Sequence, residues 1–220
     1  MNMLKKEETV NYITELVLKE ILAQGLTLEQ NKTKIPVSIS ARHIHLKKED
    51  LEMLFGSGHE LTRVKDISQP GQFAAEEKVT LVGPKGKIEN VRVLGPLRKE
   101  TQIEISITDA RTLGIKPVVR DSGNVDGTPG LTIIGPKATL QLEKGCIVAQ
   151  RHIHMTPKDA VEYGVKDGQK VMVKCLNDRG GIFDNVFVRV REDYALDMHI
   201  DTDEANAFSI GNGEIMEILK

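Results

Sequence analysis

The chain has 220 residues, of which 40% are hydrophobic and 28% are charged, and its 30 Lys and Arg nearly balance its 32 Asp and Glu. This composition is typical of a soluble globular protein, and the lack of a surplus of either charge argues against a nucleic-acid partner. Two cysteines without a spaced framework, no signal peptide and no apolar run of membrane-spanning length indicate a reduced, cytoplasmic protein with no membrane partner.

The first predicted element is an amphipathic helix over residues 5–22. Apolar residues recur there at largely helical spacing between charged ones, at Val10, Ile13, Leu16, Val17, Ile21 and Leu22. Gly25 can end this helix, and the mostly polar stretch over residues 27–34 precedes Pro36. We therefore expect residues 1–34 to form an N-terminal helix and a linker.

Beyond Pro36 the sequence predicts a mainly β fold of short strands. Trp is absent and aromatic residues make up only 4%, so β-branched and aliphatic side chains must fill the core. Turns are marked by Gly56, Gly58, Pro70-Gly71, Gly83-Pro84, Gly86, Gly95-Pro96 and Gly123. The chief helical pieces span residues 47–55 and 157–163. This pattern favours a sandwich or a barrel.

An internal repeat divides this part of the chain. Residues 37–46, with the sequence VSISARHIHL, recur as residues 146–155, with the sequence CIVAQRHIHM. Residues 78–90 likewise resemble residues 170–185, with glycines at the expected hairpin turn of both. The likeness extends beyond the shared Arg-His-Ile-His motif, so the chain looks duplicated.

Both copies of the motif place two histidines at positions i and i+2 of a predicted strand. Residues at this spacing project from one face of a strand about 6 to 7 Å apart, whereas on a helix they diverge. His43 with His45, and His152 with His154, can therefore each offer two imidazoles to one metal ion. A structural or exposed role for the histidines is the alternative, and the duplication argues against it.

The repeat supplies a third ligand for each pair. Fourteen residues after Asn90 and after Asn185 stand Glu104 and His199, each on a strand-like run shortly before a Thr-Asp pair. The ligand sets would be His₂Glu and His₃. Three protein ligands with open positions are typical of catalytic zinc, although iron, cobalt and manganese also accept these donors. We therefore expect two Zn²⁺ ions per chain.

Other reactive residues and motifs are excluded from the site. His59 lies among turn residues and has no counterpart in the repeat, so we expect it to be exposed. Cys146 and Cys175 lie in apolar strand-like runs without Cys-x-x-Cys spacing, so we expect them in the core. The chain also lacks the motifs of nucleotide hydrolysis, dinucleotide binding and serine hydrolysis.

Arg98 is the candidate for binding an oxyanion. It stands six residues before Glu104, and its guanidinium can hold an oxyanion through two hydrogen bonds. Its counterpart in the second repeat is Asp193, so the two halves do not share this cation. The polar, glycine-rich loop over residues 120–130, which contains Ser122, can line a pocket. A solvated arginine and a plain surface loop are the alternatives.

Taken together, the motifs resemble those of a known family, the phosphate propanoyltransferases. The likeness covers roughly residues 35–220 and rests on both Arg-His-Ile-His motifs and on three further segments: Gln69-Pro-Gly-Gln-Phe-Ala74, Gly95-Pro-Leu-Arg98 and Val119-Arg-Asp-Ser-Gly123. The resemblance implies two tandem related β-barrels capped by short helices, over residues 35–145 and 146–220. The strand over residues 36–41 is a candidate for exchange between them.

The same resemblance implies a reaction and its site. Members of the family interconvert a short-chain acyl-CoA, such as propanoyl-CoA or acetyl-CoA, and phosphate with acyl phosphate and CoA, in degradation of the propanediol or ethanolamine type. It also implies two zinc ions on the six ligands named above and phosphate on Arg98. Positions similar to the family's CoA contacts are Ser38, Ile39, Ser40, Lys85, Arg92 and Asn206, with Ser122 at the border of the site.

The family implies a location and further partners as well. Some members lie inside bacterial microcompartments and carry an amphipathic N-terminal targeting helix, which residues 5–22 resemble. An ordinary docking helix is the alternative. The expected location is then the cytoplasm or the lumen of a microcompartment, with shell proteins or cargo enzymes as partners, and a homo-oligomer remains open.

From the residues alone, two other functions remain open. A dinuclear metal hydrolase acting on esters or phosphates would use the same ligands, but it needs a water-activating base and no CoA pocket. A non-enzymatic, metal-stabilised binding module would have closed ligand sets instead of open ones.

Overall fold

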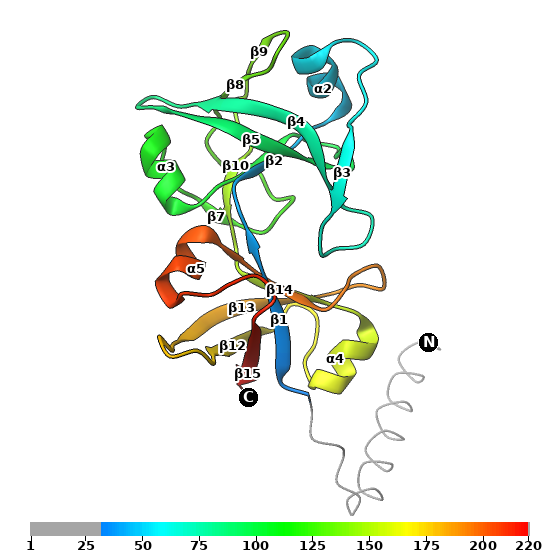
Figure 1. Ribbon diagram of the computed structural model, residues 1–220, viewed down its shortest axis with the longest axis vertical. Coiled ribbons are helices and arrows are strands. Elements are labelled where there is room, and N and C mark those ends of the chain that lie inside the picture. The colour runs from blue at the N-terminus through cyan, green and yellow to red at the C-terminus, as the bar shows by residue number, and fades with distance from the viewer. Residues whose placement is uncertain (1–31, 220) are drawn as a thin grey trace, which may run out of the picture.

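The computed structural model describes residues 32–219, in which fifteen β-strands and four short helices form two units stacked along the long axis of the molecule (Figure 1). The prediction of a mainly β fold with short helices is therefore confirmed. The helix predicted over residues 5–22 lies outside the described residues. No helix within residues 32–219 has the length and apolar character that crossing a bilayer requires.

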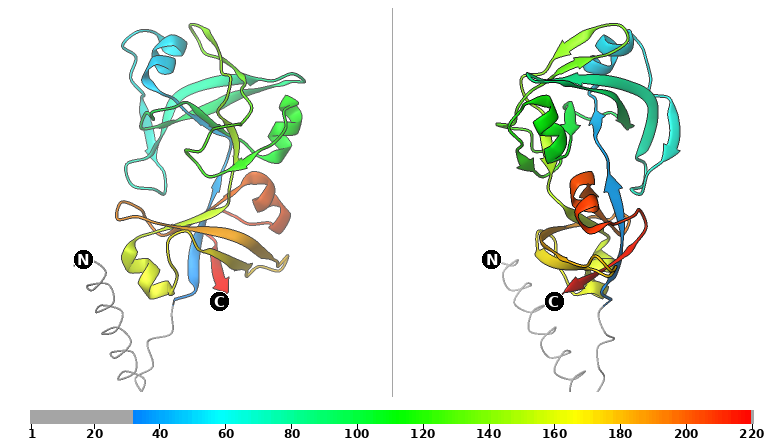
Figure 2. Two further views of the ribbon diagram at one scale, coloured as in Figure 1. Left: turned by 180° about the vertical axis from the view of Figure 1, so that it is seen from behind. Right: turned by 60° about the vertical axis from the view of Figure 1, so that its left-hand side comes forward.

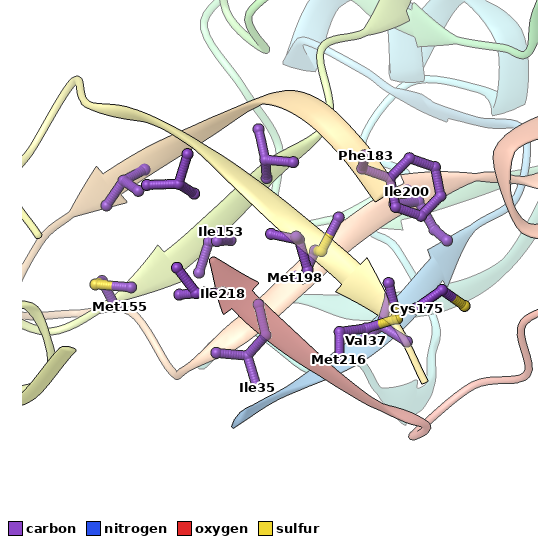
Figure 3. Packing of buried hydrophobic residues seen from close by; sticks show 14 of the residues in the cluster. Ile35, Val37, Ile153, Met155, Cys175, Phe183, Met198, Ile200, Met216 and Ile218 are labelled. Atoms are coloured by element: carbon purple, nitrogen blue, oxygen red, sulfur yellow. The ribbon is translucent and has the colours of Figure 1, made fainter. Parts of the chain in front are cut away.

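The lower unit in Figure 1 is a closed barrel of six strands. Their order around the barrel is β1 (Lys34–Ser40), β14 (Asp197–Asp201), β11 (His152–Met155), β13 (Ile182–Val190), β12 (Lys170–Cys175) and β15 (Ile215–Leu219). Alternate residues point inward and fill the barrel with the side chains of Figure 3: Ile35, Val37, Ile153, Met155, Cys175, Phe183, Met198, Ile200, Met216 and Ile218. Helices α4 (Pro157–Tyr163) and α5 (Thr202–Phe208) lie outside it.

The upper unit is a nine-stranded sheet that does not close. Its order is β7 (Val119–Arg120), β10 (Cys146–Ala149), β6 (Gln102–Glu104), β2 (His43–His45), β5 (Lys87–Gly95), β4 (Phe73–Val82), β8 (Thr132–Ile134) and β9 (Thr139–Gln141), and β3 (Arg63–Asp66) pairs with β4 outside this path. The short end strands β7 and β9 do not pair with each other, so the expectation of two closed barrels is confirmed for one unit only. Helices α2 (Lys48–Phe55) and α3 (Ile107–Leu113) pack against β9 and β5.

Two strands pair in a different unit from the strand that follows them in the sequence. β1 precedes the upper sheet along the chain, yet it pairs with β14 and β15 in the barrel. β10 is followed in the sequence by the barrel strand β11, yet it pairs with β6 and β7 in the upper sheet. The chain therefore crosses between the units at residues 41–42 and again at residues 150–151 (Figure 2). Because each His-Ile-His strand begins directly after a crossing, both lie at the junction.

The duplication seen in the sequence is present in the backbone. Strands β4 and β5 form one antiparallel hairpin and β12 and β13 form another, each with a register shift. Asn90 in the first hairpin and Asn185 in the second both have a positive φ, of 59° and 56°. This conformation is uncommon for residues with a side chain, and asparagine adopts it more readily than most. The shared irregularity supports the equivalence of Glu104 and His199 that was counted from these two positions.

In the described part of the chain both cysteines are buried, as predicted, with Cys146 in the core of the upper sheet and Cys175 in that of the barrel. His59 is half-buried, whereas the sequence predicted exposure. Its Nε2 lies 2.9 Å from the carboxylate of Glu77, which the core of the sheet covers, and this contact draws the ring inward.

Candidate metal centre

Both His-Ile-His segments are strands whose histidines face the junction between the units. In β2 and in β11 the central isoleucine is fully buried in the core of its own unit, so the two histidines beside it project from the opposite face of the strand. The ring centroids of His43 and His45 lie 5.0 Å apart, and those of His152 and His154 lie 4.5 Å apart. The strand conformation predicted for the two motifs is confirmed.

Glu104 and His199 join these pairs from the neighbouring strands. Glu104 lies opposite His43 where β2 pairs with β6, and His199 lies opposite His152 where β11 pairs with β14; both pairings are antiparallel. Within each set, one ligand atom per residue lies within 4.8 Å of the others. The structure thus contains two groups that could hold a metal ion: a first set of His43, His45 and Glu104, and a second set of His152, His154 and His199.

The ring orientations of the first set fit metal binding. Nδ1 of His43 lies 2.8 Å from the carbonyl oxygen of Ala41, and Nδ1 of His45 lies 3.2 Å from that of Leu94. When the Nδ1 atoms carry the protons and donate to these carbonyls, the Nε2 atoms are left as acceptors. Both Nε2 atoms face the Glu104 carboxylate, at 3.5 Å for His43 and 4.0 Å for His45. Three donor atoms therefore converge on one place.

Glu104 favours the ionised form although it is buried. Burial raises the pKa of its carboxyl, but the charge and hydrogen bond of His43, with the charges of His45 and Arg98, hold the pKa well below its usual range. Burial lowers the pKa of His45 well below its usual range. Burial also lowers the pKa of His43, but the Glu104 carboxylate outweighs this effect and the net pKa is raised. The negative charge of the first set thus lies on the Glu104 carboxylate, with His43 facing it.

The second set consists of neutral imidazoles. Burial, together with the charge of His199, lowers the pKa of His152 to about 4. Burial, together with the charges of the other two histidines, lowers the pKa of His154 to about 2, and burial lowers that of His199 to about 4. Nδ1 of His152 lies 2.7 Å from the carbonyl oxygen of Gln150, which leaves its Nε2 as an acceptor. Since neutral imidazole is the form that binds metals, this set fits a divalent cation.

Two buried atoms near the second set have no hydrogen-bond partner within residues 32–219: Nδ1 of His154 and Oδ2 of Asp197. Oδ2 of Asp197 lies 3.3 Å from Nε2 of His199, and burial raises the pKa of this carboxyl. Asp197 lies two residues before His199 on β14, so it projects from the same face of the strand. Buried polar atoms without a hydrogen-bond partner are uncommon, and a metal ion bound at the second set would account for these two.

Both sets open into one cavity of about 330 Å³ at the junction of the units. All six ligands line it, together with side chains that come from the upper sheet, the barrel and the loops between them, among them Ser40, Ile67, Gln69, Arg98, Ser122, Arg189 and Tyr194. A ligand set that faces a cavity can keep positions open for a substrate, which is the arrangement of catalytic sites and not of closed structural ones.

Arg98 and Ser122 lie beside the first set. Nη1 of Arg98 donates to Oγ of Ser122 at 2.9 Å and lies 3.9 Å from Oε1 of Glu104. Oγ of Ser122 in turn donates to Oε1 of Glu104 at 3.0 Å. The guanidinium, the hydroxyl and the carboxylate therefore form one connected group at the cavity wall.

Sequence reasoning missed Gln102, which completes this group. Its Nε2 lies 2.6 Å from Oε1 of Glu104 and 2.9 Å from Oγ of Ser122. Its Oε1 accepts from the backbone N–H of Gly123 at 2.7 Å and so anchors the loop that carries Ser122. The available signal was the position of Gln102 two residues before Glu104, on the same face of one strand.

Arg189 and Tyr194 also line the cavity and were not singled out from the sequence. Arg189 lies opposite His154 in the parallel pairing of β11 with β13, and within residues 32–219 it forms no ion pair. Burial is the main cause that lowers the pKa of Arg98 and of the second-set histidines, and the positive charge of Arg189 is a smaller cause in the same direction. The ring of Tyr194 lies 4.2 Å from that of His154.

Gln69 joins the two units beside the cavity. This buried side chain, in the loop between β3 and β4, donates from Nε2 to the carbonyl oxygen of Ala195 at 3.1 Å and accepts from its backbone N–H at 3.2 Å. Ala195 lies in the loop between β13 and β14. The neighbouring Ser68 has Oγ 3.4 Å from Nε2 of His199. Gln69 belongs to one of the segments that resemble the family, but nothing in the sequence indicated that its side chain contacts the second repeat.

The positions similar to CoA contacts fall into two groups. Ser40 lines the cavity, and Ser38 lies opposite His199 where β1 pairs with β14, with Ile39 between them. The other three are Lys85 in the turn between β4 and β5, Arg92 on β5 and Asn206 on α5, and of the six positions only Ser40 belongs to the cavity lining. The guanidinium of Arg92 donates to a backbone carbonyl of its own sheet at 2.5 Å. The structure thus does not gather all six around the cavity.

Comparison with known proteins gives one consistent result. The family model described as phosphate propanoyltransferase matches residues 36–211. A phosphate propanoyltransferase of Thermotoga maritima is 62% identical over 188 residues, which cover 84% of this chain and 89% of that protein. Those of Rhodobacter capsulatus and Rhodopseudomonas palustris are 52% and 47% identical over 209 and 222 residues, covering 94% and 98% of this chain and 97% and 98% of the relatives.

Proposed function

This chain belongs to the phosphate propanoyltransferase family, and from that premise we propose that it interconverts propanoyl-CoA or acetyl-CoA and phosphate with acyl phosphate and CoA. The observation that best supports the proposal is the pair of ligand sets that open into one cavity beside Arg98. Catalysis of this transfer needs a group that polarises the thioester and a cation that holds phosphate. A metal ion on the ligand sets would supply the first, and Arg98 would supply the second.

The proposed cofactor is Zn²⁺, with one ion on the first set and one on the second. The support is chemical: the first set has two histidine Nε2 atoms aimed at an ionised carboxylate, and the second has three imidazoles that are neutral at pH 7. When bound, zinc polarises a thioester carbonyl and offsets negative charge on a departing thiolate. Metal analysis of the purified protein distinguishes zinc from iron, cobalt and manganese.

Arg98 and Arg189 supply the positive charge that a phosphate dianion needs. The charge of Arg98 is shared with Glu104, 3.9 Å away. At the rim of the cavity Arg191 and Asp193 neutralise each other through two contacts of 2.9 Å. Arg189 has no ion pair within residues 32–219, so it is the surplus cation of the cavity wall. We assign phosphate to Arg98, with Ser122 and Arg189 as further contacts.

The proposed transfer is direct, from a ternary complex. An oxygen of phosphate attacks the carbonyl carbon of the thioester, the new C–O bond forms, the C–S bond breaks, and CoA leaves as its thiolate. Burial raises the pKa of the Cys146 thiol to about 12, so that thiol is no nucleophile at neutral pH. Arg98 and Ser122 hold the phosphate beside the bound thioester. The attack is then effectively unimolecular, because both reactants are already bound in the same cavity. An acyl-enzyme trapped from acyl-CoA without phosphate would contradict this mechanism.

CoA is proposed to bind along β1 and the adjoining surface. The end of β1 that contains Ser38, Ile39 and Ser40 lies next to the strand of His199 and reaches the cavity at Ser40. This end of β1 is therefore the proposed contact for the thioester end of CoA. Lys85, Arg92 and Asn206, which lie outside the cavity lining, suit its distal, phosphate-bearing part. Substitution of these three should raise the KM for acyl-CoA and leave the zinc content unchanged.

The proposed location is the cytoplasm or the lumen of a bacterial microcompartment. Its support is the amphipathic pattern of residues 5–22, which resembles a targeting helix. Fusion of residues 1–24 to a fluorescent protein, in cells that make microcompartments, tests whether this segment directs cargo into them or binds shell and cargo proteins. Sedimentation of the full chain, with and without residues 1–24, measures the oligomeric state and shows whether this segment contributes to it.

The decisive test measures release of the CoA thiol from propanoyl-CoA, and from acetyl-CoA, with and without phosphate. The proposed transferase releases thiol only when phosphate is present and forms one acyl phosphate per CoA. A dinuclear hydrolase would release thiol without phosphate. A metal-stabilised binding module would release none, and it would unfold when the metal is removed.

A further inference from the structure

The arginine of each Arg-His-Ile-His motif makes the same contact in both units. Nε of Arg42 donates to Oδ2 of Asp109 at 3.0 Å, and its Nη2 lies 2.8 Å from Oδ1 of the same carboxylate. Nε of Arg151 lies 2.8 Å from Oε1 of Glu204. The two arginines directly precede His43 and His152 in the sequence. Neither arginine has a role in the reaction proposed above.

The carboxylate partner occupies an equivalent place in both repeats. Asp109 is the third residue of helix α3, and Glu204 is the third residue of helix α5. Each accepts a hydrogen bond from the backbone N–H of the helix N-cap residue: Ser106 to Asp109 at 3.3 Å, and Asp201 to Glu204 at 3.0 Å. In return the N-cap side chain accepts from the backbone of the acid. These capping boxes hold both carboxylates in place.

The N-cap residue stands two positions after the third metal ligand. Ser106 follows Glu104 and Asp201 follows His199 at this spacing. The arginine therefore links the start of the His-Ile-His strand to the end of the strand that carries the third ligand. These strands are the antiparallel pairs in which His43 lies opposite Glu104, and His152 opposite His199. In both units the ion pair therefore joins the two paired strands at the end next to the ligands.

We propose that Arg42 and Arg151 are positioning residues, each of which holds the third ligand of its own metal set in register with the His-Ile-His strand. A metal ion needs its donor atoms within a few tenths of an ångström of their bonding distances, so a fixed register favours binding. The inference rests on the proposed metal sites and not on the acyl transfer.

An ordinary surface ion pair would have no such effect, because water screens exposed charges and their pairing contributes little to stability. The side chain of Asp109 is 4% exposed and that of Glu204 is 19% exposed, so both pairs are largely shielded on the carboxylate side. The chain offers a matched control in Arg63 and Asp66, which are 53% and 68% exposed and lie on β3 away from both sets.

The test measures the rate of zinc release from the full-length, zinc-loaded protein to a colorimetric chelator. His154→Ala leaves only the first set complete, and His45→Ala leaves only the second. In the His154→Ala protein, Arg42→Gln should speed release of the remaining zinc by about 10- to 100-fold, as loss of a supporting contact does elsewhere. Arg151→Gln should not change it. In the His45→Ala protein the two effects should be exchanged, and Arg63→Gln should change neither.

The conservative variants separate positioning from general stability. Arg42→Lys keeps the charge but loses the two-point contact, so an intermediate rate of release is expected. Asp109→Asn keeps an acceptor for the N-cap N–H and should speed release from the first set only, even if Arg42→Gln folds poorly. The double variant Arg42→Gln, Asp109→Asn should release zinc no faster than the faster single variant.

Two results would overturn the inference. Unchanged release in both backgrounds would show that the arginines do not hold the ligands. Equal acceleration at both sets, in step with a lower melting temperature, would show that they only stabilise the fold. Failure of the parent protein to bind two zinc ions would instead contradict the proposed metal sites, so the two failures are distinguishable.

Discussion

The guanidinium of Arg98 lies 3.9 Å from the carboxylate of Glu104, at the wall of the cavity that both ligand sets share. Within residues 146–219 the second repeat has no equivalent contact, because Asp193 stands at the counterpart of Arg98 and is paired with Arg191. The duplicated motif has therefore produced two unequal sites. One carries a carboxylate with a cation beside it, and the other consists of three neutral imidazoles.

Substitution of Arg98 tests the role of this contact. Arg98→Ala should lower kcat/KM for phosphate-dependent CoA release by about 10²- to 10³-fold, the usual cost of losing a donor to developing negative charge. Zinc content should stay at the level of the parent protein, since Arg98 is no ligand. Metal analysis beside the thiol-release assay checks both. Loss of zinc together with activity would mean that Arg98 acts mainly on the first set.

Substitution of Arg189 tests the second cation. Arg189→Gln should raise the KM for phosphate about 10- to 100-fold, since a charged hydrogen bond contributes about 1.5 to 3 kcal/mol and about 1.4 kcal/mol is a factor of ten. The KM for acyl-CoA should change little. Arg111→Gln, at an exposed arginine of α3, is the matched control and should behave as the parent. An unchanged KM for phosphate would remove Arg189 from the phosphate site.

The second set should make the zinc-free protein sensitive to acid. His152 and His199 have a pKa of about 4 in the folded protein, against the ordinary value of 6.5 in the unfolded chain. Between these values the unfolded chain binds more protons, so the free energy of unfolding falls as pH drops from about 6.5 to about 4, by about 1 kcal/mol per pH unit for each histidine.

Urea unfolding of the zinc-free protein at pH 7 and pH 5 measures this dependence. His152→Gln removes one of the titrating groups and should make the dependence shallower. His43, whose pKa is raised, acts in the opposite direction: its contribution is present below pH 6.5 and is lost as pH rises through the folded pKa. Comparison of the variant with the parent isolates the contribution of His152. An equal change in the free energy of unfolding between pH 7 and pH 5 in both proteins would contradict the low pKa of His152.

The contact of Gln69 with Ala195 should hold the two units in alignment. Gln69→Ala removes two hydrogen bonds and leaves the backbone of Ala195 unsatisfied, which should lower the free energy of unfolding by about 1 to 3 kcal/mol. We also expect a lower kcat with both zinc ions retained, because each ligand set lies within one unit. Gln141→Ala, at an exposed glutamine of β9, is the control. Unchanged kcat would limit Gln69 to a stabilising role.

The sequence predicted which donor side chains come together better than it predicted the architecture. The period of two along a strand places His43 beside His45 on one face, and the repeat places Glu104 and His199, because both signals are local or are counted along the chain. The pairing of β1 and β10 with strands of the other unit depends on contacts far apart in sequence, which no local pattern encodes. The same holds for Gln69, whose partner lies 126 residues away.

Arg189 and the partners of Arg42 and Arg151 were the hardest to predict from the sequence. Arg189 lies on an ordinary strand with no motif around it, and only the pairing of β13 with β11 brings it opposite His154. Arg42 and Arg151 were visible as parts of the repeated motif. Their partners Asp109 and Glu204 could not be identified, since the repeats carry different acids on helices that begin only after the ligand strands.

The most direct test of the account is a zinc titration of the metal-free protein, followed by the formation of propanoyl phosphate from propanoyl-CoA and phosphate. Activity should appear only as zinc fills both sets, and it should reach its maximum at about two ions per chain, the number of ligand sets. Full activity without zinc, or CoA release that does not require phosphate, would contradict it.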